Sequence, residues 1–359
     1  MAVRLIMAGQ VSPLRSQAIY HGVARAMGPG TPDTVILVSP TAPYVCIGFH
    51  QDVEREVNLD YCRKQGLPVV RREVGGGAVY LDGDQLFTQW VLHPGSMPMK
   101  VEERFKFHAY PIVKTYRALG IEAYFRPIND IQVAGKKIGG MGAGRIGQAE
   151  ILVGNLMFDF NTRLMASVLN VPDEKFRDKV FHSLEAYMTT MKKELGELPD
   201  QETVVALYRK FCQEAFNQPL EEGELSQEEE EAIRAQEEKM ASESWLFRPE
   251  GHARPAVKIH SGVWVGETTL KTPGGLLRIT LRLKDNTIDD ITLRGDFTFY
   301  PQDKLHQLEK TLLSTPVERD RLLERIGRFY REQQIQVPGV EPEHWVEAIE
   351  NLAQAIARN

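Results

Sequence analysis

The most constraining stretch of the chain is residues 71–82, which read Arg-Arg-Glu-Val-Gly-Gly-Gly-Ala-Val-Tyr-Leu-Asp. Three consecutive glycines have no Cβ atoms, so their backbone N–H groups can turn toward an anion or lie flat against a slender ligand. The two arginines before them carry planar guanidinium groups that suit carboxylate or phosphate oxygens. A simple glycine turn between two strands is the alternative, but the paired arginines favour an anion-binding loop.

A second glycine-rich stretch lies further along the chain. Residues 129–140 read Asn-Asp-Ile-Gln-Val-Ala-Gly-Lys-Lys-Ile-Gly-Gly, a pattern typical of a β-hairpin with a tight Ala-Gly turn and two lysines just beyond it. Lysines beside a turn usually face solvent. Here several glycines follow them, up to Gly147, and loosen the backbone. The two lysines are therefore candidates for a functional role.

Composition and charge argue against several classes of function. The chain has 359 residues, 42% of them hydrophobic and 26% charged, which is enough for two globular domains. Its net charge of −6 predicts neither nucleic acid nor an anionic membrane surface as a partner. No apolar run is long enough for a signal peptide or a membrane span. Three widely spaced cysteines, and no evident metal-ligand cluster, predict a cytoplasmic protein without disulfides.

The remaining pattern predicts alternating strands and helices. The β-rich runs at 34–38 and 44–48 are expected to pair with each other. Pro111 is expected to kink or divide a helix over 102–119. A capping-box pattern at Ser226 starts an acidic helix that is expected to face solvent. Further strands are predicted at 85–92 and 151–158, and further helices at 16–27 and 203–216.

A change in composition marks a boundary near residue 250. Residues 242–255 contain tryptophan, glycine and prolines and are typical of a linker. Beyond them, three strand patterns and three helix patterns predict a smaller unit with its own sheet.

Taken together, the two motifs resemble the signatures of lipoate–protein ligases, in the biotin/lipoate protein ligase superfamily. Residues 71–79 match the pattern Arg-Arg-x-x-Gly-Gly-Gly-Ala-Val, and residues 129–140 are similar to the family's second signature, in the same order. The resemblance covers nearly the whole chain. It includes the segment before the first motif, at 48–51 and Asn58, and a C-terminal accessory domain, at 273–275 and 295–297.

This resemblance implies a fold and a domain organisation. We expect an α+β fold like that of the biotin and lipoyl ligases, with a mixed, largely antiparallel sheet flanked by helices and a second, smaller α+β domain. The catalytic domain is expected at residues 1–247 and the accessory domain at 256–359.

The resemblance also implies two half-reactions. The carboxylate of lipoate attacks the α-phosphate of ATP to give lipoyl-AMP and pyrophosphate, and a lysine of an acceptor protein then displaces AMP. Lys137 matches the family's essential lysine and is expected to stabilise the negative charge that both steps build on oxygen. Arg72 is expected to hold phosphate oxygens, and Asn129 and Asp130 to hold adenine or Mg²⁺. The residues expected to line the nucleotide and the dithiolane tail are Gly76, Gly77, Ala78, Val79 and Tyr80.

The implied ligands are ATP, Mg²⁺ and the substrate lipoate, with the metal ligands left unassigned. The implied partner is a lipoyl-domain acceptor: an acyltransferase subunit, a glycine-cleavage H protein or a dedicated lipoate-binding protein. Neither nucleic acid nor a membrane is expected as a partner.

Two further enzyme classes stay open. An octanoyl- or lipoyl-transferase of the same superfamily would use a cysteine nucleophile and no ATP; Cys46 and Cys62 both precede the glycine loop, and no cysteine lies between residue 63 and the lysine motif. A biotin ligase is a closer relative in chemistry, but its Gly-Arg-Gly-Arg loop is missing from this chain.

A non-catalytic paralogue that binds a lipoylated protein is the third alternative. Its support is that Leu81 and Val153 stand where the family usually has histidines. The presence of both Arg72 and Lys137 argues against it.

Overall fold

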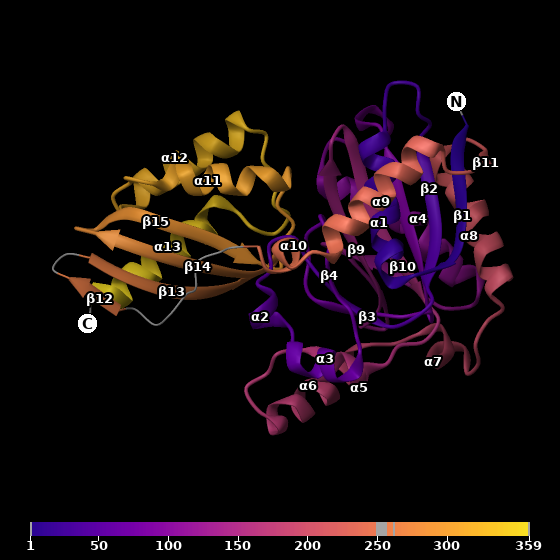
Figure 1. Cartoon of the computed structure of the whole chain (residues 1–359), viewed down its shortest axis with the longest axis horizontal. Helices are drawn as coiled ribbons and strands as arrows, with labels where there is room; N and C mark the ends of the chain where they lie inside the picture. Colours follow the sequence, from indigo (N-terminus) through magenta and orange to yellow (C-terminus); the bar gives the residue numbers. More distant parts are fainter. Residues whose placement is uncertain (1, 249–256, 261–262, 358–359) are drawn as a thin grey trace. The chain divides into compact units, whose positions relative to one another are not determined.

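The computed structural model describes residues 2–248, 257–260 and 263–357, which form two compact units (Figure 1). The first unit holds Met1–Ile47, Val53–Val74 and Ala78–Leu246. The second unit holds Gly48–Asp52, Gly75–Gly77 and Phe247–Asn359. Two short segments from early in the chain, one of them containing the three consecutive glycines, therefore belong with the C-terminal part.

An eight-stranded sheet in the order β11-β1-β2-β6-β10-β9-β8-β7 forms the centre of the first unit. Strand β1 lies parallel to β2 and β11, and the other neighbouring strands of this sheet pair antiparallel. The predicted mixed, largely antiparallel sheet is confirmed. Its strands are β1 (Val3–Val11), β2 (Thr34–Pro40), β6 (Gln85–Leu92), β7 (Tyr124–Arg126), β8 (Asp130–Val133), β9 (Lys136–Ile146), β10 (Ala149–Met157) and β11 (Leu220–Glu222).

A separate three-stranded sheet carries the first glycine motif. Strand β3 (Tyr44–Ile47) lies parallel to β4 (Val69–Arg71) and antiparallel to β5 (Val79–Leu81). The prediction that 34–38 pairs with 44–48 is therefore wrong. Strand β2 is buried along its whole length and pairs with β1 on one side and β6 on the other, so it has no free edge for β3.

Helices cover both faces of the large sheet. Val91 of β6 belongs to a core cluster with Ile19 and Ile233, whereas its neighbour Trp90 contacts Phe216 on the other side. Because successive side chains of a strand point to opposite faces, the helices that carry these residues lie on opposite faces. In the described part of the chain, no helix is long and apolar enough to cross a membrane. The helices of this unit are α1 (Pro13–Ala26), α2 (Val53–Glu56), α3 (Leu59–Gln65), α4 (Val101–Ala118), α5 (Thr162–Val168), α6 (Glu174–Tyr187), α7 (Met191–Leu195), α8 (Gln201–Phe216) and α9 (Gln227–Ala241), with a 3₁₀ turn at Pro94–Ser96 and α10 (Glu243–Phe247) at its boundary.

Pro111 does not divide α4, although the sequence pattern made a division or a kink the expectation. The helix runs unbroken from Val101 to Ala118. A proline inside a helix costs about 3 kcal/mol. The side chains of Phe105, Ile112 and Tyr116 on the same helix are fully buried, and each stabilises the packed helix by roughly 1.5–3 kcal/mol. Packing therefore offsets the cost of the proline.

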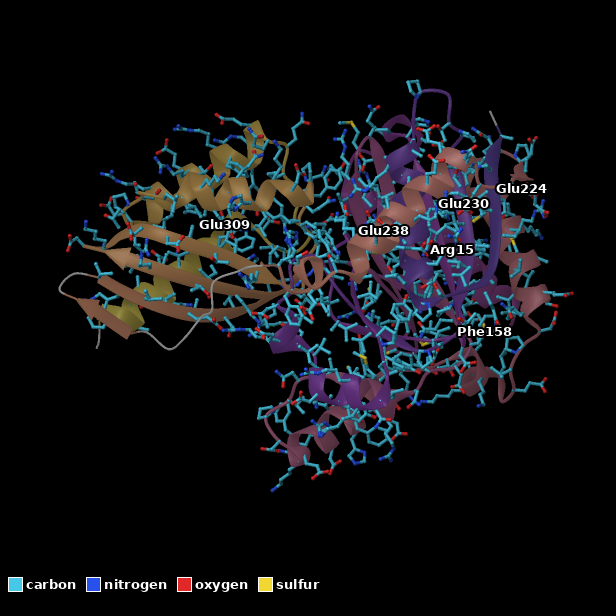
Figure 2. The ribbon with its side chains drawn as sticks, in the orientation of Figure 1. Arg15, Phe158, Glu224, Glu230, Glu238 and Glu309 are labelled. Carbon is cyan, nitrogen blue, oxygen red and sulfur yellow. The ribbon has the colours of Figure 1, made fainter. Side chains whose placement is uncertain are left out.

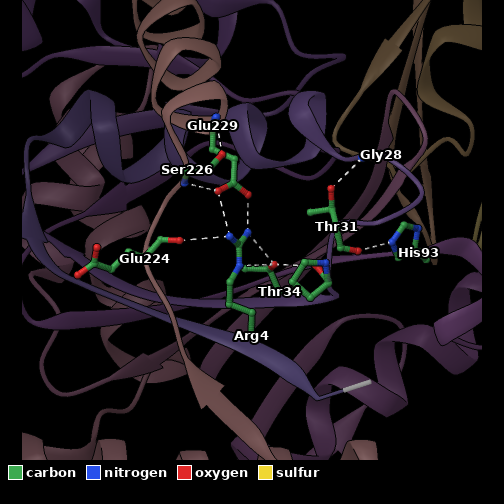
Figure 3. A network of polar contacts seen from close by, with 9 residues as sticks. Arg4, Gly28, Thr31, Thr34, His93, Glu224, Ser226 and Glu229 are labelled. Atoms are coloured by element: carbon green, nitrogen blue, oxygen red, sulfur yellow. Dashed lines mark hydrogen bonds and ion pairs between the residues drawn. The ribbon is translucent and has the colours of Figure 1, made fainter.

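Helix α9 begins at the predicted capping box but is not simply a solvated acidic face. The Ser226 hydroxyl accepts from the Glu229 N–H, and the Glu229 carboxylate accepts from the Ser226 N–H. Glu229 is 3% exposed and forms an ion pair with Arg4 of β1 (Figure 3). Further along, Glu230 accepts from Arg15 of α1 at 2.7 Å (Figure 2). Acidic residues therefore attach α9 to the rest of the unit, which corrects the prediction.

The second unit is the predicted smaller α+β unit. Alternate residues of β14 (Leu277, Ile279, Leu281, Leu283) are buried against its helices, which is the period-two pattern of a strand with one covered face. His50 stacks on Phe297 with ring centroids 5.4 Å apart, and the His50 carbonyl accepts from the Gly295 N–H. The elements are β12 (Val257–His260), β13 (Val263–Thr272), β14 (Gly275–Lys284), β15 (Thr287–Gly295), a 3₁₀ turn at Gln302–Lys304, α11 (Leu305–Leu312), α12 (Arg319–Glu332) and α13 (Pro342–Ala357), with the strands antiparallel in this order.

Two histidines in the first unit are held neutral by burial. Burial lowers the pKa of His21 to about 4 and that of His108 to about 3. The neutral form of His21 is used: its Nδ1 lies 2.6 Å from the Gln17 carbonyl, to which it donates, and its Nε2 accepts from the Glu73 N–H. His108 Nε2 lies 3.2 Å from the Thr88 hydroxyl.

We expect the free energy of unfolding to fall as the pH drops below about 6.5, the ordinary histidine pKa, toward about 4. In this window the unfolded chain binds protons that the folded chain does not, so acid favours unfolding. Urea unfolding at pH 6.5 and 4.5 measures the effect. His108→Gln should reduce the difference between the two pH values, by up to roughly 1.4 kcal/mol per pH unit, whereas the exposed His182→Gln should not. Equal pH dependence in His108→Gln and the wild type would contradict the prediction.

Candidate active site

The β8–β9 hairpin positions Lys137, the main candidate from the sequence. Its two turn residues, Ala134 and Gly135, have φ angles of 47° and 83°, as a tight two-residue hairpin turn requires. The hairpin with an Ala-Gly turn is therefore confirmed. The register pairs Lys137 with Gln132 across the two strands, and a bulge follows between Gln132 and Ile131.

The Lys137 side chain lies over its own strand beside an acidic neighbour. Its Nζ is 2.7 Å from Oδ1 of Asp130, and 30% of the side chain is exposed. A Cβ atom on Gly140 would lie 3.2 Å from both Cε and Nζ of the lysine. Glycine at this position therefore leaves space for the lysine to lie across the strand, which gives the glycines after the lysines a physical reason.

A tyrosine that the sequence did not indicate completes the surroundings of Asp130. The Tyr187 hydroxyl donates to Oδ2 of Asp130 at 2.9 Å. Tyr187 is the last residue of α6, far from the hairpin in sequence, and no local pattern distinguishes it from an ordinary helix residue. Only the folded chain brings it to this position.

Two side-chain amides connect the lysine strand to the first motif. Oδ1 of Asn155 accepts from the Gly140 N–H at 3.1 Å, and Nδ2 of Asn155 donates to Oε1 of Gln85 at 3.0 Å. Gln85 in turn lies 3.4 Å from both the Tyr80 carbonyl and Oδ1 of Asp82, and donates to them through Nε2. This chain of hydrogen bonds runs from β9 through β10 and β6 to β5. The sequence pattern identified neither amide as a site residue.

The two arginines of the first motif have different surroundings. Arg71 is 1% exposed and donates from Nη2 to the Leu246 carbonyl at 2.7 Å, and its own carbonyl accepts from the indole of Trp245. Arg72 is 9% exposed and donates from Nη1 to the Cys46 carbonyl at 3.2 Å. Arg71 therefore attaches the loop to the α10 region.

The predicted glycine-loop residues divide between the two units, with Gly76 and Gly77 in the second and Ala78, Val79 and Tyr80 in the first. Gly76 has a φ of 99°, a conformation that favours glycine. Tyr80 is 4% exposed, and its ring packs edge-on against Phe160. Burial raises the pKa of the Tyr80 hydroxyl, with Asp82 adding to the shift.

The Asn129 side chain closes the open end of the hairpin. Its Nδ2 donates to the Met141 carbonyl at 2.8 Å, and the backbone carbonyl of Asn129 accepts from the Met141 N–H at 2.9 Å. Among the described residues, no group of three His, Cys, Asp or Glu side chains is placed to hold a metal ion. The acidic side chain of the hairpin is that of Asp130, and it contacts Lys137.

The arrangement is suited to holding an anion. A lysine ammonium has three N–H donors, of which one contacts Asp130 here. The neighbouring backbone is glycine, and the strand beneath it is fixed by the Asn155 amide. Of the two positions that lack the family's usual histidines, Val153 lies opposite Gly142 on β9, and Leu81 lies in β5 opposite Tyr44.

We expect Asn155→Ala to destabilise the first unit by about 1–3 kcal/mol, because it leaves the Gly140 N–H and the buried Gln85 side chain without this partner. Urea unfolding measures the change. Asn170→Ala is the matched control, since its side chain also donates to one carbonyl but at an exposed position; its effect should be within about 0.5 kcal/mol. Equal losses of unfolding free energy in the two variants would show that the Asn155 hydrogen bonds stabilise the unit no more than an exposed one does.

Comparison with known proteins gives matches over both parts of the chain. Residues 12–213, more than half of the chain, match the family model for the lipoyl protein ligase A/B catalytic domain, and residues 267–349 match that for the bacterial lipoate protein ligase C-terminus. Lipoate-protein ligase A subunit 1 of Thermoplasma acidophilum is 32% identical over 214 residues, which is 56% of this chain and 79% of that protein. Octanoyltransferase LipM of Kyrpidia tusciae is 26% identical over 270 residues, 68% of this chain and 98% of that protein.

Two solved structures share the fold. A bipartite lipoate protein ligase of Thermoplasma acidophilum, studied with its E2 lipoyl domain, has a TM-score of 0.64 and 27% identity, and the match covers 70% of this chain and 99% of that one. LipL1 of P. falciparum in complex with lipoate has a TM-score of 0.67 at 13% identity and matches 99% of both chains, which shows a common fold. On the strength of its catalytic-domain match, this chain belongs to the lipoyl protein ligase A/B family.

Proposed function

We propose that this protein is an ATP-dependent lipoate–protein ligase, which converts lipoate to lipoyl-AMP and transfers the lipoyl group to a lysine of an acceptor protein. The observation that carries the proposal is the position of Lys137: its ammonium lies over Gly140 and beside Asp130, on the strand that follows the hairpin turn. The lysine thus supplies a cation that is held by an ion pair and lies against a glycine-rich strand.

In the first step, the carboxylate oxygen of lipoate forms a bond to the α-phosphorus of ATP and pyrophosphate leaves. Negative charge on the acyl carboxylate and the phosphate oxygens is stabilised by the donors of Lys137, of which two remain beyond the one that contacts Asp130. Arg72 is the second cation that we assign to phosphate oxygens. Gly76, Gly77, Ala78, Val79 and Tyr80 are proposed to line the ligand.

In the second step, the amine of the acceptor lysine attacks the acyl carbonyl and AMP leaves. Charge again develops on the carbonyl oxygen, and the flexible stem of Lys137 allows its ammonium to follow the charge from the phosphate to the acyl group. No covalent bond to the enzyme forms in either step. The role of Lys137 is electrostatic.

Mg²⁺ would supply charge neutralisation on the phosphates of ATP. Magnesium in such sites is usually held by one or two carboxylates together with substrate phosphates, and not by a protein cage. The carboxylate of Asp130, beside Lys137, supports this arrangement. We assign Asn129 and Asp130 to adenine or to the metal.

The alternative is transfer through a cysteine without ATP, and the LipM relative gives it weight. That chemistry needs an accessible thiolate. All three cysteines of the chain, Cys46, Cys62 and Cys212, are buried, at 0%, 1% and 0% exposure. Burial raises the pKa of each thiol, for Cys62 to about 11. This environment favours the ligase.

The acceptor is proposed to be a lipoyl-domain protein: an acyltransferase subunit, a glycine-cleavage H protein or a dedicated lipoate-binding protein. Support comes from the bipartite lipoate protein ligase of Thermoplasma acidophilum, which shares this fold and belongs with its E2 lipoyl domain to an archaeal lipoylation system. We assign residues 1–247 to the catalytic domain and 256–359 to an accessory domain, and place the reaction in the cytoplasm.

We expect Lys137→Ala to reduce the rate of lipoyl-AMP formation by about 10²–10³, because the lysine stabilises charge in the transition state. The fold should stay intact. Pyrophosphate release from ATP and lipoate measures the rate. Lys136→Ala, which removes the exposed neighbour, is the matched control and should keep wild-type activity. If the wild type releases no pyrophosphate, the ligase proposal fails. Wild-type rates in Lys137→Ala would remove the lysine from the mechanism.

Cys46→Ser and Cys62→Ser should each transfer lipoate with at least about half of the wild-type rate, since no thiol takes part. Transfer is measured as lipoylation of an acceptor domain with and without ATP. Because Cys46 is packed in the core, the amount of folded protein is checked by circular dichroism. A folded variant that loses transfer, together with wild-type transfer from an acyl donor in the absence of ATP, would support the cysteine mechanism instead.

A further inference from the structure

The end of helix α6 contacts both the backbone and the side-chain partner of Lys137. Met188, directly after the helix, forms a β-bridge with Lys137, and the Thr189 N–H donates to the Lys137 carbonyl at 2.9 Å. Tyr187, one residue earlier, donates to Asp130. Three consecutive residues, 187–189, therefore contact Lys137 or its partner Asp130.

Both oxygens of the Asp130 carboxylate are engaged. Oδ1 lies 2.7 Å from Lys137 Nζ, and Oδ2 accepts from the Tyr187 hydroxyl at 2.9 Å. With one oxygen held by the tyrosine, rotation of the carboxylate is restricted. The other oxygen therefore faces the ammonium in one orientation.

Gln132 determines the direction in which the tyrosine proton points. Gln132 is 3% exposed; its Oε1 accepts from the Tyr124 hydroxyl at 3.2 Å, and its Nε2 lies 3.4 Å from the Tyr187 oxygen, to which it donates. An amide nitrogen can only donate. The Tyr187 oxygen accepts from Gln132, so its own proton is directed to Asp130.

We propose that Tyr187 is a positioning residue of the reaction, which fixes the Asp130 carboxylate and through it the Lys137 ammonium at the place where the acyl and phosphate oxygens react. This inference rests on the proposed function of Lys137. In this role Tyr187 acts through Asp130 and Lys137 and not through a contact of its own with the substrate. The ion pair orients the lysine without occupying it, because two of its three N–H donors remain for the anion.

Tyr187→Phe removes only the hydroxyl and keeps the ring. Loss of a hydrogen bond to a charged group, felt through Lys137, should lower the kcat of acyl-AMP formation about tenfold. The KM values for lipoate and ATP should stay within about twofold, because the lysine is misplaced in the transition state while the binding surfaces are unchanged.

Tyr110→Phe is the matched control. Tyr110 is 38% exposed against 40% for Tyr187, and its hydroxyl also donates to a carboxylate, that of Glu214. It lies on α4, outside the site. Its kinetic constants should equal those of the wild type.

A second measurement needs no substrate. The ¹⁵N order parameter of the Lys137 ammonium, with the signal assigned by comparison with Lys137→Ala, should fall by about a third in Tyr187→Phe and stay unchanged in Tyr110→Phe. If the wild type forms no acyl-AMP, the proposed function fails and the order parameter alone tests the positioning. An unchanged order parameter in Tyr187→Phe overturns the inference, as does a loss of kcat that comes with an equal loss of folded protein.

Discussion

The buried carboxylate of Glu73 is the contact on which the arrangement of the first unit depends most. It is 7% exposed, and its Oε1 lies 2.6 Å from both Arg25 of α1 and Lys239 of α9. Burial by itself raises the pKa of this carboxyl, yet the His21 ring and the cations Lys239 and Arg25 outweigh burial and lower it to about 2. A charge buried without partners would cost several kcal/mol. The pairing therefore requires both helices to lie at the entrance of the glycine motif.

A second buried ion pair holds the other face of the sheet. Arg104 of α4 donates to Glu150 of β10 at 2.7 Å, with exposures of 8% and 2%. Removing one partner of such a pair leaves a buried charge without compensation, which strongly destabilises the fold. The folded chain must therefore keep the two side chains together. Helices on both faces are thus fixed by ion pairs as well as by apolar packing. Strand β10, next to the lysine strand, is held by α4 through this pair.

The candidate site uses the same principle on a smaller scale. Lys137 has an acidic partner, that partner has a tyrosine donor, and the strand below has an amide that connects it to the first motif. Each polar group is oriented by a neighbour that is itself hydrogen-bonded. A cation fixed in this way needs little rearrangement when charge develops on a substrate, which is the property that electrostatic catalysis requires. The cysteines, by contrast, are buried, and burial raises the pKa of each thiol.

The features that the sequence alone determined are those with local causes. The hairpin around Lys137 follows from its Ala-Gly turn, in which Gly135 readily takes a positive φ, and the start of α9 follows from a capping pair three residues apart. The buried strands of the C-terminal sheet follow from the period-two alternation of apolar residues. The two motifs also identified the family, because their residue types and order are distinctive.

Tertiary structure decided everything that depends on which distant segments become neighbours. Strand β3 pairs in another sheet because β2 already has a partner on each side. Arg71 donates to the Leu246 carbonyl beyond the end of α9, and Glu229 of α9 pairs with Arg4, because packing brings these segments together. Asn155 of β10 contacts the lysine strand at Gly140, and Tyr187 of α6 contacts Asp130, the partner of Lys137. Their contacts depend on strand register and on where a helix ends in space, and neither is encoded by the residues next to them in the chain.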